Sequence, residues 1–171
     1  MEYLIYKSYY KGQPLSVGEN LSFEVWRPSL WNPVPKGLPQ KYIIFYLFYL
    51  FRMFSNPNYL AILGHHNGKI ACSLLIAPKY FKWPFMKPKD VQLIYVKTYP
   101  EFRGKGYGKK MLVYTLDYLK NINLEGDVWY VTDSENKASQ ALAKSVDFKQ
   151  DFYGKRTYLF GIKWIKQLTI K

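Results

Sequence analysis

Cysteine and histidine are scarce in this sequence. The 171 residues include one cysteine, Cys72, and two histidines, His65 and His66. A single thiol cannot form an internal disulfide, which fits a reducing compartment. The two histidines have no third ligand at a suitable spacing, so we predict no metal site and expect both to be solvent-exposed turn residues. Residues 1–6 also lack the basic start of a signal peptide, and we predict a cytoplasmic protein.

Acidic residues are few as well. Aspartate and glutamate number 12 against 25 lysines and arginines, which gives a formal net charge of +13. Such an excess requires an anionic partner, and nucleic acid, an anionic membrane surface and a phosphorylated cofactor all satisfy it. The lysines form no dense run, and no nucleic-acid-binding signature is present. We therefore expect no nucleic acid partner and favour a phosphate-rich small molecule.

The sequence also lacks a hydrophobic run of membrane-spanning length. The longest apolar segment, Tyr42–Phe54, has 13 residues, whereas a transmembrane helix needs about 20. We predict a buried helix here. The alternative is a helix lying at a membrane interface, in peripheral contact with the membrane.

Apolar residues are nevertheless plentiful, at 49% of the chain, so a packed core is expected. The length suits a single domain spanning residues 1–171. Hydrophobic periodicity predicts strands followed by alternating helices and strands, which indicates a mixed α+β sheet. The predicted strands are Glu2–Tyr6, Tyr59–Leu63, Ile70–Ala77, Asp90–Val96, Val128–Val131 and Tyr153–Gly161. The predicted helices are Lys109–Asn121 and Asn136–Ser145, the second with Ala138, Ala141, Leu142 and Val146 on one side.

Two connecting segments carry distinct signals. Asn67-Gly68 tolerates positive φ at both positions and predicts a tight hairpin between the second and third strands. Residues Gly12–Pro39 hold five prolines and little periodicity, so we predict a long irregular loop. Trp26 and Trp31 are expected to fold this loop back over the molecule.

The segment from Arg103 to Gly108 has the chemistry of a phosphate-binding turn. Its three glycines follow a predicted strand and open a predicted helix. Glycine lets a ligand touch the backbone, and a helix N-terminus presents unpaired N–H groups to an anion. The segment lacks the Gly-Lys-Ser/Thr ending of a P-loop and the surroundings of a Rossmann motif. A plain glycine-rich turn is the alternative.

The flanking residues favour one family. Arg103-x-x-Gly106-x-Gly108 resembles the Arg/Gln-x-x-Gly-x-Gly/Ala pyrophosphate motif of GNAT acetyltransferases. Some 30 residues later, Asn136-x-Ala138-Ser139 followed by Asp147-Phe148 is similar to a second signature of that superfamily. The resemblance covers residues 59–160, the expected CoA-binding core, and leaves residues 1–58 as a divergent N-terminal region on the acceptor side.

The resemblance implies a GNAT fold, with a mixed, mostly antiparallel central sheet, splayed middle strands and helices on both faces. It implies acetyl-CoA as co-substrate, no metal, and transfer of the acetyl group to a primary amine by direct attack in a ternary complex. By resemblance, the pyrophosphate binds the glycine loop, the pantetheine binds the preceding strand end, and Asn136 and Ser139 contact the cofactor. The implied CoA-binding residues are Tyr95, Val96, Lys97, Thr98, Arg103, Gly104, Lys105, Gly106, Tyr107, Gly108, Lys109, Asn136 and Ser139.

Catalytic residues are harder to assign. The family often has a tyrosine seven residues after the motif asparagine, where this chain has Ala143. Amine attack requires a base, for which Asp90 is the first candidate, with Gln92 facing the same side of the strand. The alternative for Asp90 is a structural pair with a lysine. Tyr130 is our candidate acid, in competition with Tyr95 and Tyr153. Asp133 and Glu101 are weaker candidate bases.

The acceptor is least defined. Phe81-x-x-Pro84-Phe85-Met86 and neighbouring segments resemble bacterial GNAT proteins associated with surface polysaccharides, which suggests a small-molecule amine such as an amino sugar or nucleotide-amino sugar. A peptide or protein amine, and CoA binding without catalysis, are the alternatives. A homodimer is a further partner that the sequence leaves open.

Overall fold

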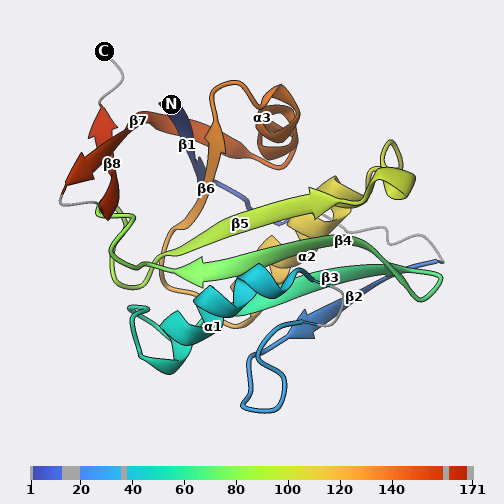
Figure 1. The fold of residues 1–171 in the computed structure, drawn as a ribbon. Coiled ribbons are helices and arrows are strands. Elements are labelled where there is room, and N and C mark those ends of the chain that lie inside the picture. The colour runs from blue at the N-terminus through green and yellow to red at the C-terminus, as the bar shows by residue number, and fades with distance from the viewer. Residues whose placement is uncertain (1, 13–19, 36–37, 160–161, 169–171) are drawn as a thin grey trace.

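The computed structural model describes residues 2–12, 20–35, 38–159 and 162–168. They form one eight-stranded sheet in the order β2-β3-β4-β5-β6-β1-β7-β8 (Figure 1). All neighbouring strands are antiparallel except β5 and β6. The strands are β1 (Glu2–Ser8), β2 (Leu21–Trp26), β3 (Leu60–His66), β4 (Lys69–Pro78), β5 (Val91–Thr98), β6 (Val128–Asp133), β7 (Phe148–Leu159) and β8 (Ile162–Leu168). The helices are α1 (Ile43–Leu50), α2 (Tyr107–Asn121) and α3 (Lys137–Lys144), with 3-10 turns at Gln40–Tyr42 and Pro100–Phe102.

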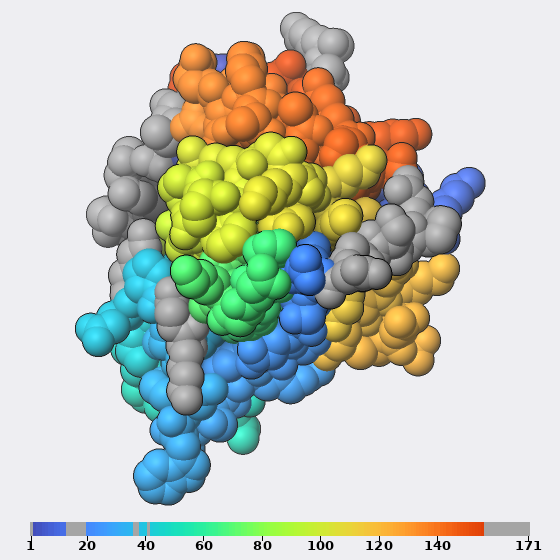
Figure 2. Space-filling model, turned by 90° about the vertical axis from the view of Figure 1, so that its right-hand side faces the viewer, coloured from blue at the N-terminus to red at the C-terminus, as the bar shows by residue number. Residues whose placement is uncertain are grey.

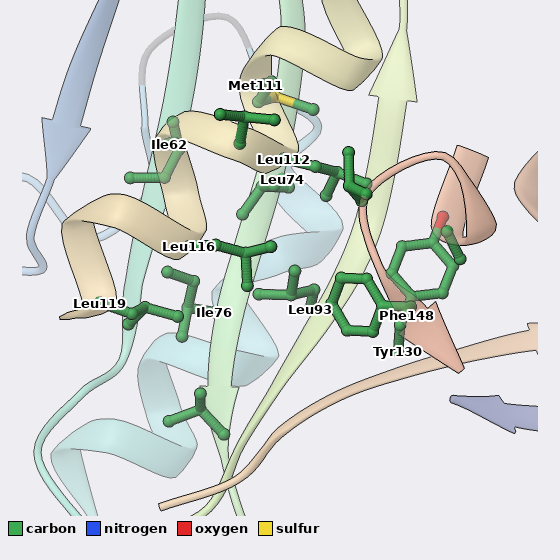
Figure 3. Packing of buried hydrophobic residues seen from close by; sticks show 14 of the residues in the cluster. Ile62, Leu74, Ile76, Leu93, Met111, Leu112, Leu116, Leu119, Tyr130 and Phe148 are labelled. Atoms are coloured by element: carbon green, nitrogen blue, oxygen red, sulfur yellow. The ribbon is translucent and has the colours of Figure 1, made fainter. Parts of the chain in front are cut away.

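Helices cover both faces of the sheet. Side chains alternate along β4, so that Leu74 and Ile76 join the cluster beneath α2 and α3, whereas Leu75 packs with residues of α1. Figure 3 shows Leu112 and Leu116 of α2 among these buried side chains. In Figure 1, α1 lies in front of the sheet and α2 behind it. The predicted fold class, a mostly antiparallel mixed sheet between helices, is confirmed.

The first strand lies in the interior of the sheet. β1 pairs with β6 on one edge and with β7 on the other. Ile5 and Tyr6, both fully buried, face opposite sides of the sheet. The strand itself was predicted, but its partners are more than a hundred residues away in sequence.

The proline-rich segment is not simply an irregular loop. Within it, β2 pairs with β3 at the edge of the sheet, and Phe23 stacks on Tyr114 of α2 with ring centroids 4.6 Å apart. The described residues after β2 protrude at the bottom of Figure 2. Trp26 is buried as expected, but the prediction for Trp31 is wrong, because this side chain is 96% exposed. Residues 13–19 and 36–37 of the predicted loop lie outside the described residues.

The apolar run also differs from the prediction. It forms an eight-residue helix, α1, rather than a thirteen-residue one. Phe45 and Tyr46 are buried, but Ile43, Ile44 and Leu50 are exposed, so the helix lies on the surface instead of inside the core. In the described parts of the chain, no helix has both the length and the apolarity needed to cross a bilayer.

The hairpin between β3 and β4 is confirmed, with φ values of 49° at Asn67 and 74° at Gly68. The expectation that both histidines are simply exposed is wrong. His66 Nδ1 lies 2.8 Å from the Tyr107 hydroxyl, and His65 Nε2 lies 3.0 Å from a Glu24 carboxylate oxygen. The hairpin tip therefore touches the start of α2.

The second predicted helix is present as α3, but its inward face was misassigned. Ala138 and Ala141 are exposed, whereas Ala143 is fully buried. Val146 is buried as expected.

Candidate active site

A cleft opens where two neighbouring strands part. β5 and β6 run parallel and pair only through Val91↔Val128, Gln92↔Trp129 and Leu93↔Tyr130. Beyond these pairs both strands continue unpaired with each other, so the splay of the middle strands is confirmed. The space between them has a volume of about 310 Å³. It is lined by Tyr3, Phe45, Tyr80, Lys82, Trp83, Gln92, Leu93, Ile94, Tyr95, Val96, Tyr130, Val131, Thr132, Asp133, Asn136 and Ser139.

A β-bulge shapes the β5 side of this cleft. Between the pairs Leu75↔Ile94 and Ser73↔Lys97, β5 contains one residue more than β4. Tyr95 lies there with φ of 53°, in the left-handed region that costs a bulky residue roughly 1–2 kcal/mol. Because the strand turns at this point, the buried part of β5 ends at Leu93, and Tyr95 is 46% exposed. The strand is therefore buried on both faces only in its first half.

The glycine loop presents free main-chain donors. Gly104 and Gly106 have φ values of 76° and 72°, and a Cβ atom at either position would meet no atom of the described residues within 4 Å. Within the described part of the chain, none of the N–H groups from 104 to 109 donates to a protein acceptor. Arg103, Lys105 and Lys109 are exposed around them. This combination of unpaired donors, helix N-terminus and cations fits the linked phosphates of CoA.

The third glycine of the loop has a different role. A Cβ atom at Gly108 would lie 3.1 Å from Thr98 Oγ1, so glycine allows α2 to pack closely against the end of β5. Arg103 Nε also donates to the Thr98 carbonyl oxygen at 3.4 Å. The loop is thereby fixed next to the strand end that leads out of the cleft.

Tyr130 and Ser139 meet on the other side of the cleft. The two hydroxyl oxygens are 2.8 Å apart, which joins β6 to α3. Burial raises the pKa of the Tyr130 hydroxyl, and its hydrogen bond to Ser139 lowers the pKa in part. Asn136 caps α3, since its Oδ1 accepts from the Ser139 N–H at 3.0 Å. Ser139 therefore contributes its main chain to the helix cap and its side chain to Tyr130.

Asp90 and Gln92 differ in their surroundings. Asp90 is 1% exposed, and its oxygens accept hydrogen bonds from Lys87 N, Asp127 N and Trp129 Nε1 at 2.8–2.9 Å. These contacts support a structural role in joining β5 to β6, with backbone and indole donors rather than a lysine side chain. Gln92 is equally buried but lines the cleft, and its Oε1 has no hydrogen-bond partner among the described residues. Asp133 is the one carboxylate among the described residues that line the cleft.

One wall of the cleft was missed by sequence reasoning. Phe45, Tyr80 and Trp83 line it but lie on α1 and on the segment after β4. Phe45 precedes residues 59–160, and Tyr80 and Trp83 belong to neither of the two cofactor motifs, so only the aromatic character of the three residues marks them. In the described ranges, no group of three His, Cys, Asp or Glu side chains is arranged to hold a metal ion.

Comparison with known proteins gives consistent findings. A family model described as the acetyltransferase (GNAT) family matches residues 23–148. No curated protein matches the sequence significantly. A GCN5-related N-acetyltransferase from Sphaerobacter thermophilus has a TM-score of 0.61 at 13% identity, covering 89% of this chain and 49% of its own.

Two other solved structures are similar. A GCN5-related N-acetyltransferase from Kribbella flavida has a TM-score of 0.54 at 8% identity, covering 88% of this chain and 55% of its own. An IAA acetyltransferase from Bacillus cereus has a TM-score of 0.54 at 15% identity, covering 85% of this chain and 95% of its own. The chain thus spans about half the length of the Sphaerobacter and Kribbella proteins. At these identities the likeness shows the fold alone.

Proposed function

The chain belongs to the GNAT acetyltransferase family, and from this premise we propose that it transfers an acetyl group from acetyl-CoA to a primary amine of a small molecule. The single observation that carries the proposal is the cleft between β5 and β6, with free main-chain donors at the adjacent glycine loop. Acetyl-CoA supplies the thioester carbonyl that a neutral amine attacks directly in a ternary complex.

The cofactor is assigned to residues 103–109 and to the part of β5 that lies beyond its pairing with β6. The six successive N–H groups from 104 to 109, which have no acceptor in the described part of the chain, support binding of the pyrophosphate. Past Leu93, β5 still pairs with β4 but no longer with β6, and we assign an extended pantetheine to the edge of Tyr95–Thr98 from which β6 diverges. Asn136 and Ser139 line the opposite side of the cleft, and their contact with the cofactor stays a prediction.

Tyr130 is the proposed general acid. It lines the cleft, and its hydroxyl, protonated at neutral pH, can donate its proton to the leaving thiolate. Ser139 orients the phenol. In this arrangement the strand residue Tyr130 serves where many family members use a helix tyrosine, because Ala143, at that helix position, has no acidic group.

Gln92 and Asp133 are the residues that we propose bind the acceptor amine and remove its proton. The unpartnered Oε1 of Gln92 accepts an N–H of the acceptor amine and orients it. Asp133 takes the amine proton, directly or through water, as the carboxylate that lines the cleft. Asp90 is not included, because three donors of the protein already occupy its oxygens.

An amino sugar, free or nucleotide-linked, is the proposed acceptor class. The aromatic side chains Phe45, Tyr80 and Trp83 offer faces for a sugar ring, and Lys82 offers a cation for a phosphate. A cationic peptide is disfavoured by the net charge of +13. In this proposal residues 1–171 act as one domain whose residues 1–58 contribute Tyr3 and Phe45 to the acceptor side. A cytoplasmic location and a homodimer remain predictions.

The test is thiol release from acetyl-CoA with a panel of amino sugars, nucleotide-amino sugars, lysine peptides and polyamines. We expect free thiol to be released when a sugar amine is present. Mass spectrometry should then show that the amine of the sugar has been acetylated. Release with peptides alone would replace the proposed acceptor by a peptide amine. CoA binding by calorimetry without release for any amine would leave a non-catalytic CoA-binding protein.

A further inference from the structure

The outer face of α1 is apolar where a surface helix is normally polar. Its sequence, IIFYLFYL, contains no charged side chain. Ile43, Ile44 and Leu50 are 40%, 45% and 46% exposed, while Phe45 and Tyr46 fill the core. A helix that is apolar all round belongs in a protein interior or in a membrane. In the described structure, only one side of α1 packs against the core, and the other side is exposed.

The apolar surface extends beyond the helix. Phe51 and Met53, just after α1, are 70% and 44% exposed. Phe81, 44% exposed, joins them from the segment after β4, because its ring lies 5.8 Å from that of Phe48. We call this surface the α1 patch; it comprises Ile43, Ile44, Leu50, Phe51, Met53 and Phe81. Contiguous exposed apolar surface of this kind marks an interaction site.

The sequence on both sides of the α1 patch residues carries charge of one sign. Residues 25–89 contain nine lysines and arginines and no aspartate or glutamate. A hollow of about 490 Å³ within this region is lined by Arg52 and Lys79 together with Met53, Phe81 and other residues, none of them acidic. Cations beside apolar side chains match an anionic headgroup above acyl chains.

We propose that the α1 patch docks on an anionic phospholipid bilayer. With eight residues, α1 is too short to cross the hydrocarbon core and lies in the plane of the interface. Its outer side chains enter the acyl boundary, while Arg52 and Lys79 contact lipid phosphates. Phe45, on the inner side of the same helix, lines the cleft, so docking brings the acceptor side of the cleft close to the membrane surface.

Vesicle co-sedimentation tests this proposal without acetyl-CoA, so the outcome does not depend on transferase activity. The full chain is mixed with vesicles of phosphatidylcholine alone or of phosphatidylcholine with phosphatidylglycerol. We expect binding to the anionic vesicles only, and weakening by salt. The double variant Leu50→Glu, Phe51→Glu should bind at least about tenfold more weakly. The matched control is Tyr9→Glu, since Tyr9 is 49% exposed elsewhere on the surface.

The charge contribution is tested separately. Arg52→Gln and Lys79→Gln should each weaken anionic-vesicle binding about fivefold, whereas Lys144→Gln, an exposed position on α3, should not. Circular dichroism and melting temperature verify that each variant folds. Absence of binding to anionic vesicles by the wild-type chain overturns the proposal. A second outcome also overturns it: light scattering shows that the wild-type chain is a dimer, Phe51→Glu makes it a monomer, and neither protein binds vesicles. The α1 patch is then a self-association surface.

Discussion

At the scale of single residues, two buried polar groups near the head of β5 have opposite tasks. Asp90 and Gln92 are two positions apart, and each is 1% exposed. The carboxylate of Asp90 is filled by three donors of the protein, whereas the Oε1 of Gln92 has none among the described residues. A buried carboxylate whose hydrogen bonds are all made stabilises the junction of the two strands. A buried acceptor without a donor gains a hydrogen bond when a ligand supplies the donor.

Asp90→Asn should lower stability rather than change catalysis. The amide would place an N–H₂ group against one of the donors that the carboxylate now accepts from, so the free energy of unfolding should fall by about 2 kcal/mol. Urea denaturation measures the loss, with the exposed Asp151→Asn as control. A variant of unchanged stability with a shifted pH–rate profile would instead return Asp90 to the role of base.

Tyr130→Phe should slow the chemical step. Losing the hydroxyl that faces Ser139 removes the proposed acid, and kcat should fall about a hundredfold with little change in the Kd of acetyl-CoA. Tyr6→Phe is the matched control, because Tyr6 is a buried phenol paired with Tyr130 across the β1–β6 ladder. Equal kcat values for both variants would exclude Tyr130 from catalysis.

At the scale of elements, the turn from β5 into α2 divides its glycines between two tasks. Gly104 and Gly106 have positive φ and open space beside them, whereas Gly108 brings the helix against Thr98. Substitution at Gly108 therefore disturbs packing, and substitution at Gly106 reports on the ligand. The hairpin tip offers a comparison, since Gly68 has a φ of 74° and is equally open.

Gly106→Glu should weaken acetyl-CoA binding by at least about tenfold, because the new carboxylate repels phosphate and obstructs the main-chain donors. Gly68→Glu should suffer the same backbone strain with no effect on affinity. Calorimetry gives both Kd values, and urea denaturation verifies that the two variants lose similar stability. Matching affinities in the two variants would remove the glycine loop as the pyrophosphate site.

At the scale of the whole molecule, the core contains several acids that are held protonated. Burial raises the pKa of Cys72 and of Tyr80 to about 12, and raises the pKa of Tyr59 further. Their protons stay on in the folded state at a pH where unfolded thiols and phenols lose them. The folded state is therefore favoured below the unfolded pKa values and loses this advantage above them.

Stability should fall as pH rises from about 9 to 11, because the unfolded chain binds fewer protons than the native one over this range. Urea denaturation at successive pH values measures the free energy of unfolding, and tyrosinate absorbance follows ionisation on unfolding. A constant free energy of unfolding across this range would contradict the burial of these side chains.

Local patterns in the sequence determined much of this fold. The Asn67-Gly68 turn, α2 and the glycine loop that precedes it were predicted correctly, because turn chemistry and helical periodicity depend on residues a few positions apart. The spacing of two motifs also indicated the family, which the match over residues 23–148 confirmed. With the family came the splayed strands, whose pairing stops at Leu93↔Tyr130.

Tertiary structure decided what depends on distant partners. The place of β1 between β6 and β7, the exposure of Trp31 and the surface position of α1 are absent from any local pattern. The same holds for the three donors that fill Asp90, two of which come from residues 127 and 129. The physical reason is that periodicity indicates which side chains are apolar or polar, whereas pairing across the sheet determines which of them meet.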